Sequence, residues 1–163
     1  MSEAWLNLDV VRSALHVGLE AESGAFAFST NLNYSFTAYS LLDLYNDTLV
    51  PALRILQFSG DADPCVPYMG TSRWIESLAM PVVAPWRPWS SDNAKFAGYV
   101  TTYGPERCGD GIADDMNGTG CFTFATVRDA GHMVPRYKGQ EALEMITRFL
   151  ANEHLPSNRP ELP

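Results

Sequence analysis

The sequence predicts an α/β fold in which helices cover the faces of a sheet. Two observations support this prediction: short apolar runs typical of strands recur along the chain, and stretches with helical spacing of apolar residues alternate with them. The expected strands are 54–58, 96–103 and 122–127, and the expected helices are 9–17, 41–53, 70–79 and 140–153. Since 46% of the 163 residues are hydrophobic, the chain can form one globular unit with a real core.

The three predicted strands are bounded by turn-forming residues. Residues 54–58 form an apolar run ended by Ser-Gly-Asp, which is typical of a strand buried on both faces. The runs 96–103 and 122–127 lie on either side of a glycine-rich loop. The stretch 81–89 is rich in Pro and Trp, so we expect it to be irregular.

The last helix has the clearest signal. Within 140–153 the apolar residues recur at the spacing of one helix face, which predicts a buried stripe made of Ala142, Met145, Ile146, Phe149 and Leu150. The other predicted helices rest on the same spacing, whereas 24–40 shows no clear period and is expected to be irregular. The tail 156–163 is polar and proline-rich and is expected to fray, so the predicted domain spans 1–155.

The charge of the chain excludes two classes of partner. The formal net charge is −8 and the pI is about 4.7, which would repel phosphate backbones and anionic lipid surfaces. No cluster of Lys and Arg reverses this locally. No apolar stretch approaches the roughly 20 residues needed to cross a bilayer. We therefore expect neither nucleic acid nor a membrane as a partner.

The three cysteines predict one disulfide. Cys108 and Cys121 flank a loop rich in Gly, Asp and Asn, and a bond between them would close this loop in an oxidising compartment. Cys65 is left over, as a free thiol or as the partner of a cysteine outside this chain. The loop also contains residues of the kind that bind calcium: Asp110, Asp114, Asp115 and Asn117. Their offsets do not match the alternating pattern of a calcium loop, so no metal site is predicted.

Two features indicate different compartments. The first residues lack the charged-then-apolar layout of a signal peptide, which favours the cytosol. Three N-x-Ser/Thr sequons, at Asn33, Asn46 and Asn117, instead predict glycosylation in the secretory pathway. The residues alone leave both compartments open.

Two loops that follow predicted strands contain residues able to perform chemistry. The loop 59–64 contains Asp61 and Asp63, and the loop 129–135 contains His132. In α/β sheets the working residues lie in such loops, at the carboxyl ends of strands. A serine hydrolase needs an imidazole base oriented by a carboxylate, and the α/β-hydrolases place the acid before the histidine in the chain. Turn formation is the ordinary alternative role for these residues, and spacing does not decide between Asp61 and Asp63 as the acid.

At these loops the chain resembles a known family. Phe58-Ser59-Gly60-Asp61-Ala62-Asp63 with Val66-Pro67, and Gly131-His132-Met133-Val134-Pro135, resemble the two signature loops of the serine carboxypeptidases. Other segments resemble the family in the same order: Ala14-Leu15-His16-Val17, Gly70-Thr71-Ser72-Arg73-Trp74-Ile75, Pro85-Trp86-Arg87-Pro88-Trp89 and Phe122-Thr123-Phe124-Ala125-Thr126-Val127-Arg128. The resemblance therefore covers nearly the whole chain.

The resemblance implies roles for the loop residues. The second Asp of the first loop, Asp63, matches the family's triad acid, and His132 matches its general base, which leaves Asp61 to shape the loop. The residues implied to lie beside the substrate are Met133, Val66 and Cys65. The family's nucleophile lies in a Gly-Glu-Ser-Tyr-x-Gly segment that is not found here, and Ser72, in the nearest local match, is expected in a helix.

The resemblance also implies what the whole protein is. The chain would be the C-terminal half of an α/β-hydrolase fold, with a mixed, mostly parallel sheet and flanking helices. Its partner would be the missing N-terminal part or large chain that contains the serine. The enzyme would release C-terminal residues from a peptide substrate without a cofactor, in a secreted, lysosomal or vacuolar location. An acyltransferase of the same fold and a truncated, non-catalytic binding fragment are the alternatives.

Overall fold

The computed structural model describes residues 2–27, 33–92, 94–109 and 120–157. The chain divides into two compact units, Met1–Tyr39 and Ser40–Pro163, and each is described by itself. Whether both belong to one domain spanning 1–155 stays a prediction, and residues 158–163 of the predicted tail lie outside the described residues.

The first unit contains three short helices: α1 (Ser2–Leu6), α2 (Asp9–Ala14) and α3 (Glu20–Ser23). The predicted helix at 9–17 is shorter than expected because His16 has a φ of +56°, a left-handed conformation that an α-helix cannot continue through. Arg12 of α2 is 4% exposed and organises the unit. Its guanidinium donates hydrogen bonds to four acceptors: the carbonyl oxygens of Gly18 and Gly24, Asn7 Oδ1 and Ser23 Oγ.

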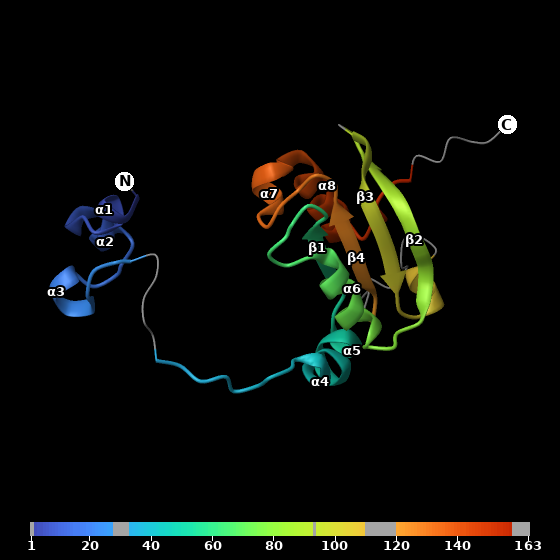
Figure 1. The fold of residues 1–163 in the computed structure, drawn as a ribbon, viewed down its shortest axis with the longest axis horizontal. Coiled ribbons are helices and arrows are strands. Elements are labelled where there is room, and N and C mark those ends of the chain that lie inside the picture. The colour runs from blue at the N-terminus through green and yellow to red at the C-terminus, as the bar shows by residue number, and fades with distance from the viewer. Residues whose placement is uncertain (1, 28–32, 93, 110–119, 158–163) are drawn as a thin grey trace. The chain divides into compact units, whose positions relative to one another are not determined.

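The second unit is built on a four-stranded sheet with the order β1-β4-β3-β2 (Figure 1). The strands are β1 (Ile55–Gly60), β2 (Val82–Ser91), β3 (Ala94–Tyr103) and β4 (Phe122–Val127). The sheet is mixed, as predicted, and the three predicted strands are confirmed. The expectation of a mostly parallel sheet is wrong for the described strands, because β1 and β4 are parallel while β3 runs antiparallel to both β4 and β2.

The stretch 81–89, predicted to be irregular, instead lies largely in strand β2. This strand is at the edge of the sheet, where a proline that lacks a backbone N–H is tolerated, so Pro85 and Pro88 do not prevent pairing with β3. The buried side chain of Trp89 anchors the edge strand β2 to the core. It is 1% exposed, and its indole Nε1 donates to the carbonyl oxygen of Thr126 at 2.9 Å.

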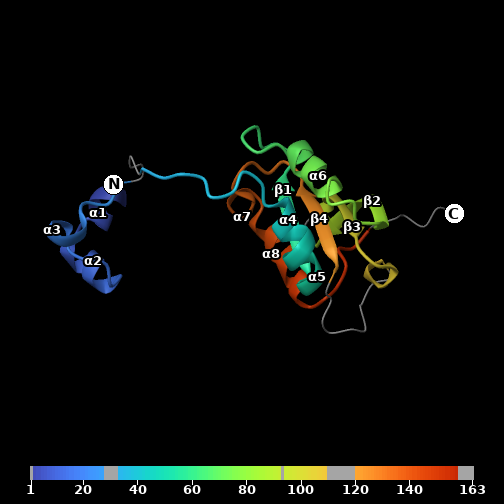
Figure 2. The same cartoon turned by 90° about the horizontal axis from the view of Figure 1, so that it is seen from below.

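Helices cover both faces of the sheet (Figure 2). One face is covered by α6 (Tyr68–Glu76) together with the consecutive helical segments α4 (Leu42–Leu44), a π-helical turn at Tyr45–Leu49 and α5 (Val50–Ala52). The other face is covered by α7 (Val134–Tyr137) and α8 (Gly139–Leu150), and a 3-10 turn at Glu106–Cys108 follows β3. The α/β arrangement with flanking helices is thus present.

The pleat of β4 divides the core between the two faces. Phe122 and Phe124, both 0% exposed, point towards the α6 face, while Ala125 and Val127 point towards the α8 face. On the α8 face the fully buried Met145 packs into the core. Full burial of a side chain of this size stabilises a fold by about 1.5–3 kcal/mol. Of the predicted apolar stripe, Ala142 and Met145 are buried as expected. The expectation of burial is wrong for Ile146 and Leu150, which are 38% and 71% exposed, because α8 packs on the sheet through the side that bears Ala142 and Met145.

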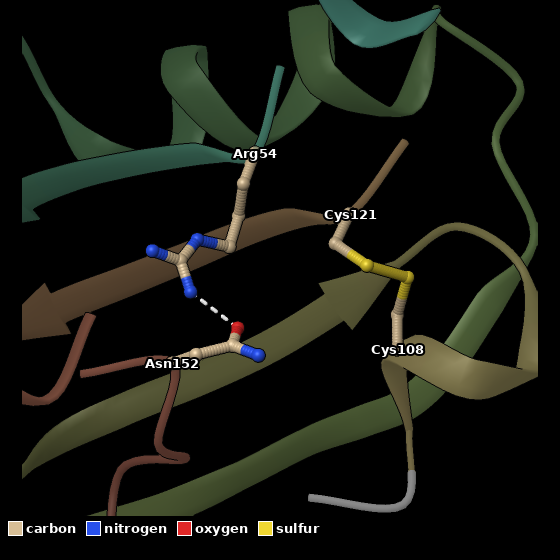
Figure 3. Close-up of a disulfide and its surroundings, with 4 residues drawn as sticks. All are labelled: Arg54, Cys108, Cys121 and Asn152. Atoms are coloured by element: carbon tan, nitrogen blue, oxygen red, sulfur yellow. Dashed lines mark hydrogen bonds between the residues drawn. A yellow bond between two sulfur atoms is a disulfide. The ribbon is translucent and has the colours of Figure 1, made fainter. Parts of the chain in front are cut away.

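Cys108 and Cys121 form the predicted disulfide, with their Cα atoms 5.6 Å apart (Figure 3). The bond ties the end of the 3-10 turn to the start of β4. Close to it, the guanidinium of Arg54 donates to Asn152 Oδ1 and lies over the Phe149 ring, 4.5 Å from its centre. The amino end of the parallel strand pair is thus fastened by both a covalent bond and a polar contact.

Within the described ranges, no helix combines the length and the apolar character that a bilayer span requires.

Candidate active site

The parallel pairing of β1 and β4 brings the two predicted loops together. In this pairing Gly60, the last residue of β1, lies opposite Val127, the last residue of β4. Because parallel strands end at the same edge of a sheet, the loop after Gly60 and the loop after Val127 emerge side by side. The acid loop and the histidine loop, which are 69 residues apart at their functional positions, therefore share one edge.

Asp63 and His132 meet at this edge. His132 Nδ1 lies 3.0 Å from Asp63 Oδ2. The other carboxylate oxygen, Asp63 Oδ1, accepts a hydrogen bond from the backbone N–H of Cys65 at 2.8 Å. The Asp63 side chain is 6% exposed and the His132 side chain is 62% exposed. A buried carboxylate thus binds the Nδ1 edge of an imidazole that is otherwise largely exposed.

The surroundings of Asp63 keep its carboxylate ionised. The hydrogen bond from His132 lowers the pKa of Asp63 most, and the backbone N–H groups of Cys65 and Val66 lower it further. Burial opposes them by raising the pKa, and the net pKa lies below the ordinary value of an aspartate. At neutral pH the residue is therefore a carboxylate that can orient and stabilise an imidazolium.

This geometry can perform the acid–base half of a nucleophilic hydrolysis. A carboxylate at Nδ1 fixes the imidazole tautomer, so that Nε2 of His132 is the nitrogen able to take a proton from a hydroxyl. The exposure of the ring leaves room for a nucleophile and a substrate on that side.

The alternative acid, Asp61, lies in the same loop but binds elsewhere. Asp61 Oδ1 accepts a hydrogen bond from the backbone N–H of Asp129 at 2.7 Å. Its carboxylate is thus engaged with the main chain of the histidine loop, whereas the Asp63 carboxylate contacts the His132 ring. Spacing alone could not separate the two residues, because both lie in the same turn.

The other residues predicted beside the substrate lie around the pair. Cys65 is exposed and is not part of the disulfide, while Val66 and Met133 are 50% and 46% exposed. Their contact with a substrate stays a prediction. The sequence reasoning missed Tyr137, which is 56% exposed and lies beside the histidine loop, since a Cβ added at Gly131 would be 3.4 Å from its ring. The available signal for Tyr137 was Pro135. Proline favours the first turn of a helix, so it predicts a short helix directly after the histidine loop, and Tyr137 lies in that helix.

Ser72 lies in α6, where its hydroxyl donates to Glu76 Oε1 at 2.9 Å, four residues further along the helix. It is thus in a regular helix and not in a strand-to-helix turn of the kind that presents a nucleophile.

Two of the three predicted glycosylation sites lie within the described residues. Asn33 and Asn46 are exposed, and their glycosylation stays a prediction. Asn117 and the acidic residues weighed as calcium ligands lie outside the described residues. In the part of the chain that is described, no group of three His, Cys, Asp or Glu side chains gathers to hold a metal ion.

Comparison with known proteins gives one consistent family. A family model described as serine carboxypeptidase matches residues 1–152. The chain is 37% identical over 152 residues to Serine carboxypeptidase-like 21 of Arabidopsis thaliana, an alignment that covers 93% of this chain and 28% of that relative. It is 36% identical over 151 residues to Serine carboxypeptidase-like 20 of the same plant, covering 92% and 27%. It is 35% identical over 156 residues to Serine carboxypeptidase 1 of Hordeum vulgare, covering 95% and 28%.

These alignments also show what share of each relative's length the chain matches. The chain spans less than a third of the length of the three curated relatives, although nearly all of the chain is matched.

Proposed function

This chain belongs to the serine carboxypeptidase family, and we propose that it is the C-terminal portion of an α/β-hydrolase domain that releases C-terminal amino acids from peptides. The observation that supports this proposal most is the contact of His132 Nδ1 with the buried Asp63 carboxylate, at the edge where two parallel strands end. A Ser-His-Asp triad needs this contact whatever chain supplies the serine.

The two residues have separate roles in the proposed mechanism. A serine outside this chain attacks the scissile carbonyl carbon, and His132 takes the proton of the serine hydroxyl. His132 then gives this proton to the leaving amine, and an acyl-enzyme forms. Water, deprotonated by His132, attacks the acyl-enzyme and releases the shortened peptide. Asp63 holds the imidazole in place and stabilises its positive charge. The mechanism requires no cofactor.

The partner in this proposal is the N-terminal part of the same domain, or a large chain separated from it. Within the described sheet, β1 is an edge strand that pairs with β4 alone. A long edge strand offers unpaired N–H and C=O groups to a further strand. Leu143 and Leu150 of α8 are 67% and 71% exposed and lie seven residues apart, on one side of the helix. We propose that the serine-containing part covers these surfaces.

The peptide substrate would lie over the exposed side of His132. Val66, Met133 and Cys65 are exposed, and in this proposal they contact the residues around the scissile bond. The net charge of −8 argues against nucleic-acid and membrane partners.

The compartment in this proposal is secreted, lysosomal or vacuolar. The disulfide between Cys108 and Cys121 supports it, because such bonds persist in oxidising compartments. The exposed sequons at Asn33 and Asn46 support it as well.

The test uses the complete protein that contains this chain. A fluorophosphonate that modifies active serines should label one serine outside residues 1–163, and the label should be lost in His132→Ala. Blocked peptides should then lose one C-terminal residue at a time, without transfer of the acyl group to an added alcohol. Transfer in preference to hydrolysis would show an acyltransferase, and labelling that survives in His132→Ala would refute the triad.

A further inference from the structure

The acid loop and the histidine loop are joined by a second set of contacts that does not include the Asp63–His132 pair. Asp61 Oδ1 accepts from the backbone N–H of Asp129 at 2.7 Å, and the backbone N–H of Asp61 donates to the carbonyl oxygen of Val127 at 3.1 Å. The backbone N–H of Ala62 donates to the carbonyl oxygen of Ala130 at 3.0 Å. Two main-chain bonds and one side-chain bond thus connect the loops.

The side-chain bond acts on an unusual backbone conformation. Asp129 has a φ of +56°, in the left-handed region that, apart from glycine, mainly Asn and Asp adopt. The turn closes with a bond from the Ala130 N–H to the Val127 carbonyl oxygen at 3.4 Å, near the upper limit of hydrogen-bond length. The carboxylate of Asp61 accepts from the N–H of Asp129 within this turn and so adds a second contact to it.

The position of this turn decides where the base lies. His132 follows Asp129 by three residues, so a rotation of the turn moves the imidazole relative to Asp63. We propose that Asp61 is a positioning residue, whose carboxylate holds the Asp129 N–H and thereby keeps His132 Nδ1 in contact with Asp63. Its effect on catalysis rests on the proposed function, whereas its effect on the His132–Asp63 contact does not.

The chemistry of Asp61 suits this task. A hydrogen bond from a backbone N–H to a carboxylate is shorter and stronger than one to a neutral acceptor. The two aspartates of the loop act on different targets, since Asp63 is buried against the imidazole and Asp61 lies exposed at the turn.

The test compares three variants of the complete protein. Asp61→Ala removes the acceptor, and Asp61→Asn keeps an oxygen at the same place without the charge. Asp43→Ala removes an exposed acid of α4 that takes no part in either loop. One readout is kcat against KM with a blocked peptide. The other is the downfield proton resonance of His132 Nδ1–H, which reports its hydrogen bond to Asp63 in the absence of any substrate.

The expected results separate positioning from folding. Asp61→Ala should lower kcat by about 10- to 100-fold with little change in KM, because a displacement on the order of 1 Å costs this much. Its His132 Nδ1–H resonance should broaden or disappear. Asp61→Asn should restore the resonance and most of kcat, and Asp43→Ala should match the wild type.

Two results would overturn the proposal: an unchanged resonance in Asp61→Ala, or an Asp61→Asn variant as impaired as Asp61→Ala. If Asp61→Ala does not fold, hydrogen exchange of the Asp129 amide in the wild type tests whether this amide is bound by Asp61. Slow exchange supports the bond to Asp61, and exchange at the rate of a free amide refutes it. A wild type that shows the resonance but cleaves no peptide would refute the proposed function alone.

Discussion

Gly60 lies directly against the carbonyl oxygen of Ala130, so closely that a Cβ added at Gly60 would be 2.2 Å from that oxygen. The carbonyl oxygen of Gly131 would lie 2.5 Å from the same Cβ. The main chain of the acid loop and that of the histidine loop are therefore in contact at a place where only glycine fits. A shift of either main chain at this contact would therefore move Asp63 relative to His132.

Gly60→Ala should separate the two loops. Since the obstructing atoms are backbone oxygens, relief requires a main-chain shift, and the free energy of unfolding should fall by about 1–3 kcal/mol. The kcat for peptide cleavage should fall by more than the loss of folded protein alone would explain, because the shift lies between the acid and the base. Denaturant titration and kcat measure the two effects.

Gly70→Ala is the matched control for this change. A Cβ at Gly70 would meet nothing within 4 Å, and the residue lies in α6. Alanine favours a helix over glycine by about 1 kcal/mol, so Gly70→Ala should leave stability unchanged or raise it. Equal losses in both variants would contradict the importance of the Gly60–Ala130 contact.

The pKa of Asp63 should depend on His132. In the wild type the carboxyl should titrate below the range of an ordinary aspartate, chiefly because His132 donates to it. In His132→Ala its midpoint should move upward, since burial then acts with less opposition. Carbon-detected NMR titration of the side-chain carboxyl measures both midpoints, and an unchanged midpoint would contradict the assigned cause.

The same shift predicts how stability depends on pH. Because the folded pKa of Asp63 lies below its unfolded value of about 3.9, its interactions contribute stability above that pH. The contribution disappears as the pH falls through the folded pKa. The stability difference between the wild type and His132→Ala should therefore be largest above about pH 4 and should shrink below it, as denaturant titrations across this range would show.

The disulfide should stabilise the second unit. Cys108 and Cys121 are 13 residues apart, and closing a loop of about 15 residues is worth about 3 kcal/mol in the chain-entropy account. A Cys108→Ser/Cys121→Ser double variant should lose about this free energy of unfolding. In the isolated chain, alkylation before and after reduction, followed by mass measurement, should show one reactive thiol and then three. Three reactive thiols before reduction would contradict the bond.

The contribution of helix α8 to stability should come from its buried face and not from its exposed face. Met145 is fully buried, so Met145→Ala should cost about 2–5 kcal/mol. Leu143, two residues earlier, is 67% exposed in this chain. In the isolated chain, Leu143→Ala should change stability by less than about 0.5 kcal/mol. A loss in the complete protein alone would indicate that the proposed partner covers this residue.

Periodicity predicted the parts of the fold in which packing dominates. Strand β4 was expected at the residues where it is found, because its alternate side chains are buried on both faces between helices. Helix α8 was expected because its apolar residues recur at helical spacing, and Ala142 and Met145 of this set are buried. Strand β2 was not expected, because its prolines indicate a loop. Proline is tolerated in an edge strand, but whether a strand lies at an edge depends on the order of the strands in space, which the sequence does not show directly.

The candidate site was predictable in part. Placement after strands indicated that an aspartate of the first loop pairs with His132. It could not distinguish Asp61 from Asp63, because the two differ in the direction in which their carboxylates point. That direction depends on the backbone of the other loop, including the left-handed Asp129, which no local pattern reveals. The family resemblance supplied the choice of Asp63.

The most direct measurement is kcat of the complete protein with Ala at position 132. If His132 is the base held by Asp63, peptide cleavage by His132→Ala should fall by about 10⁴- to 10⁶-fold, as when a triad base is removed from other serine hydrolases. His16→Asn is the control, because Asn tolerates the left-handed backbone of that exposed residue, and it should match the wild type. A His132→Ala enzyme that keeps kcat within about tenfold of the wild type would contradict the account.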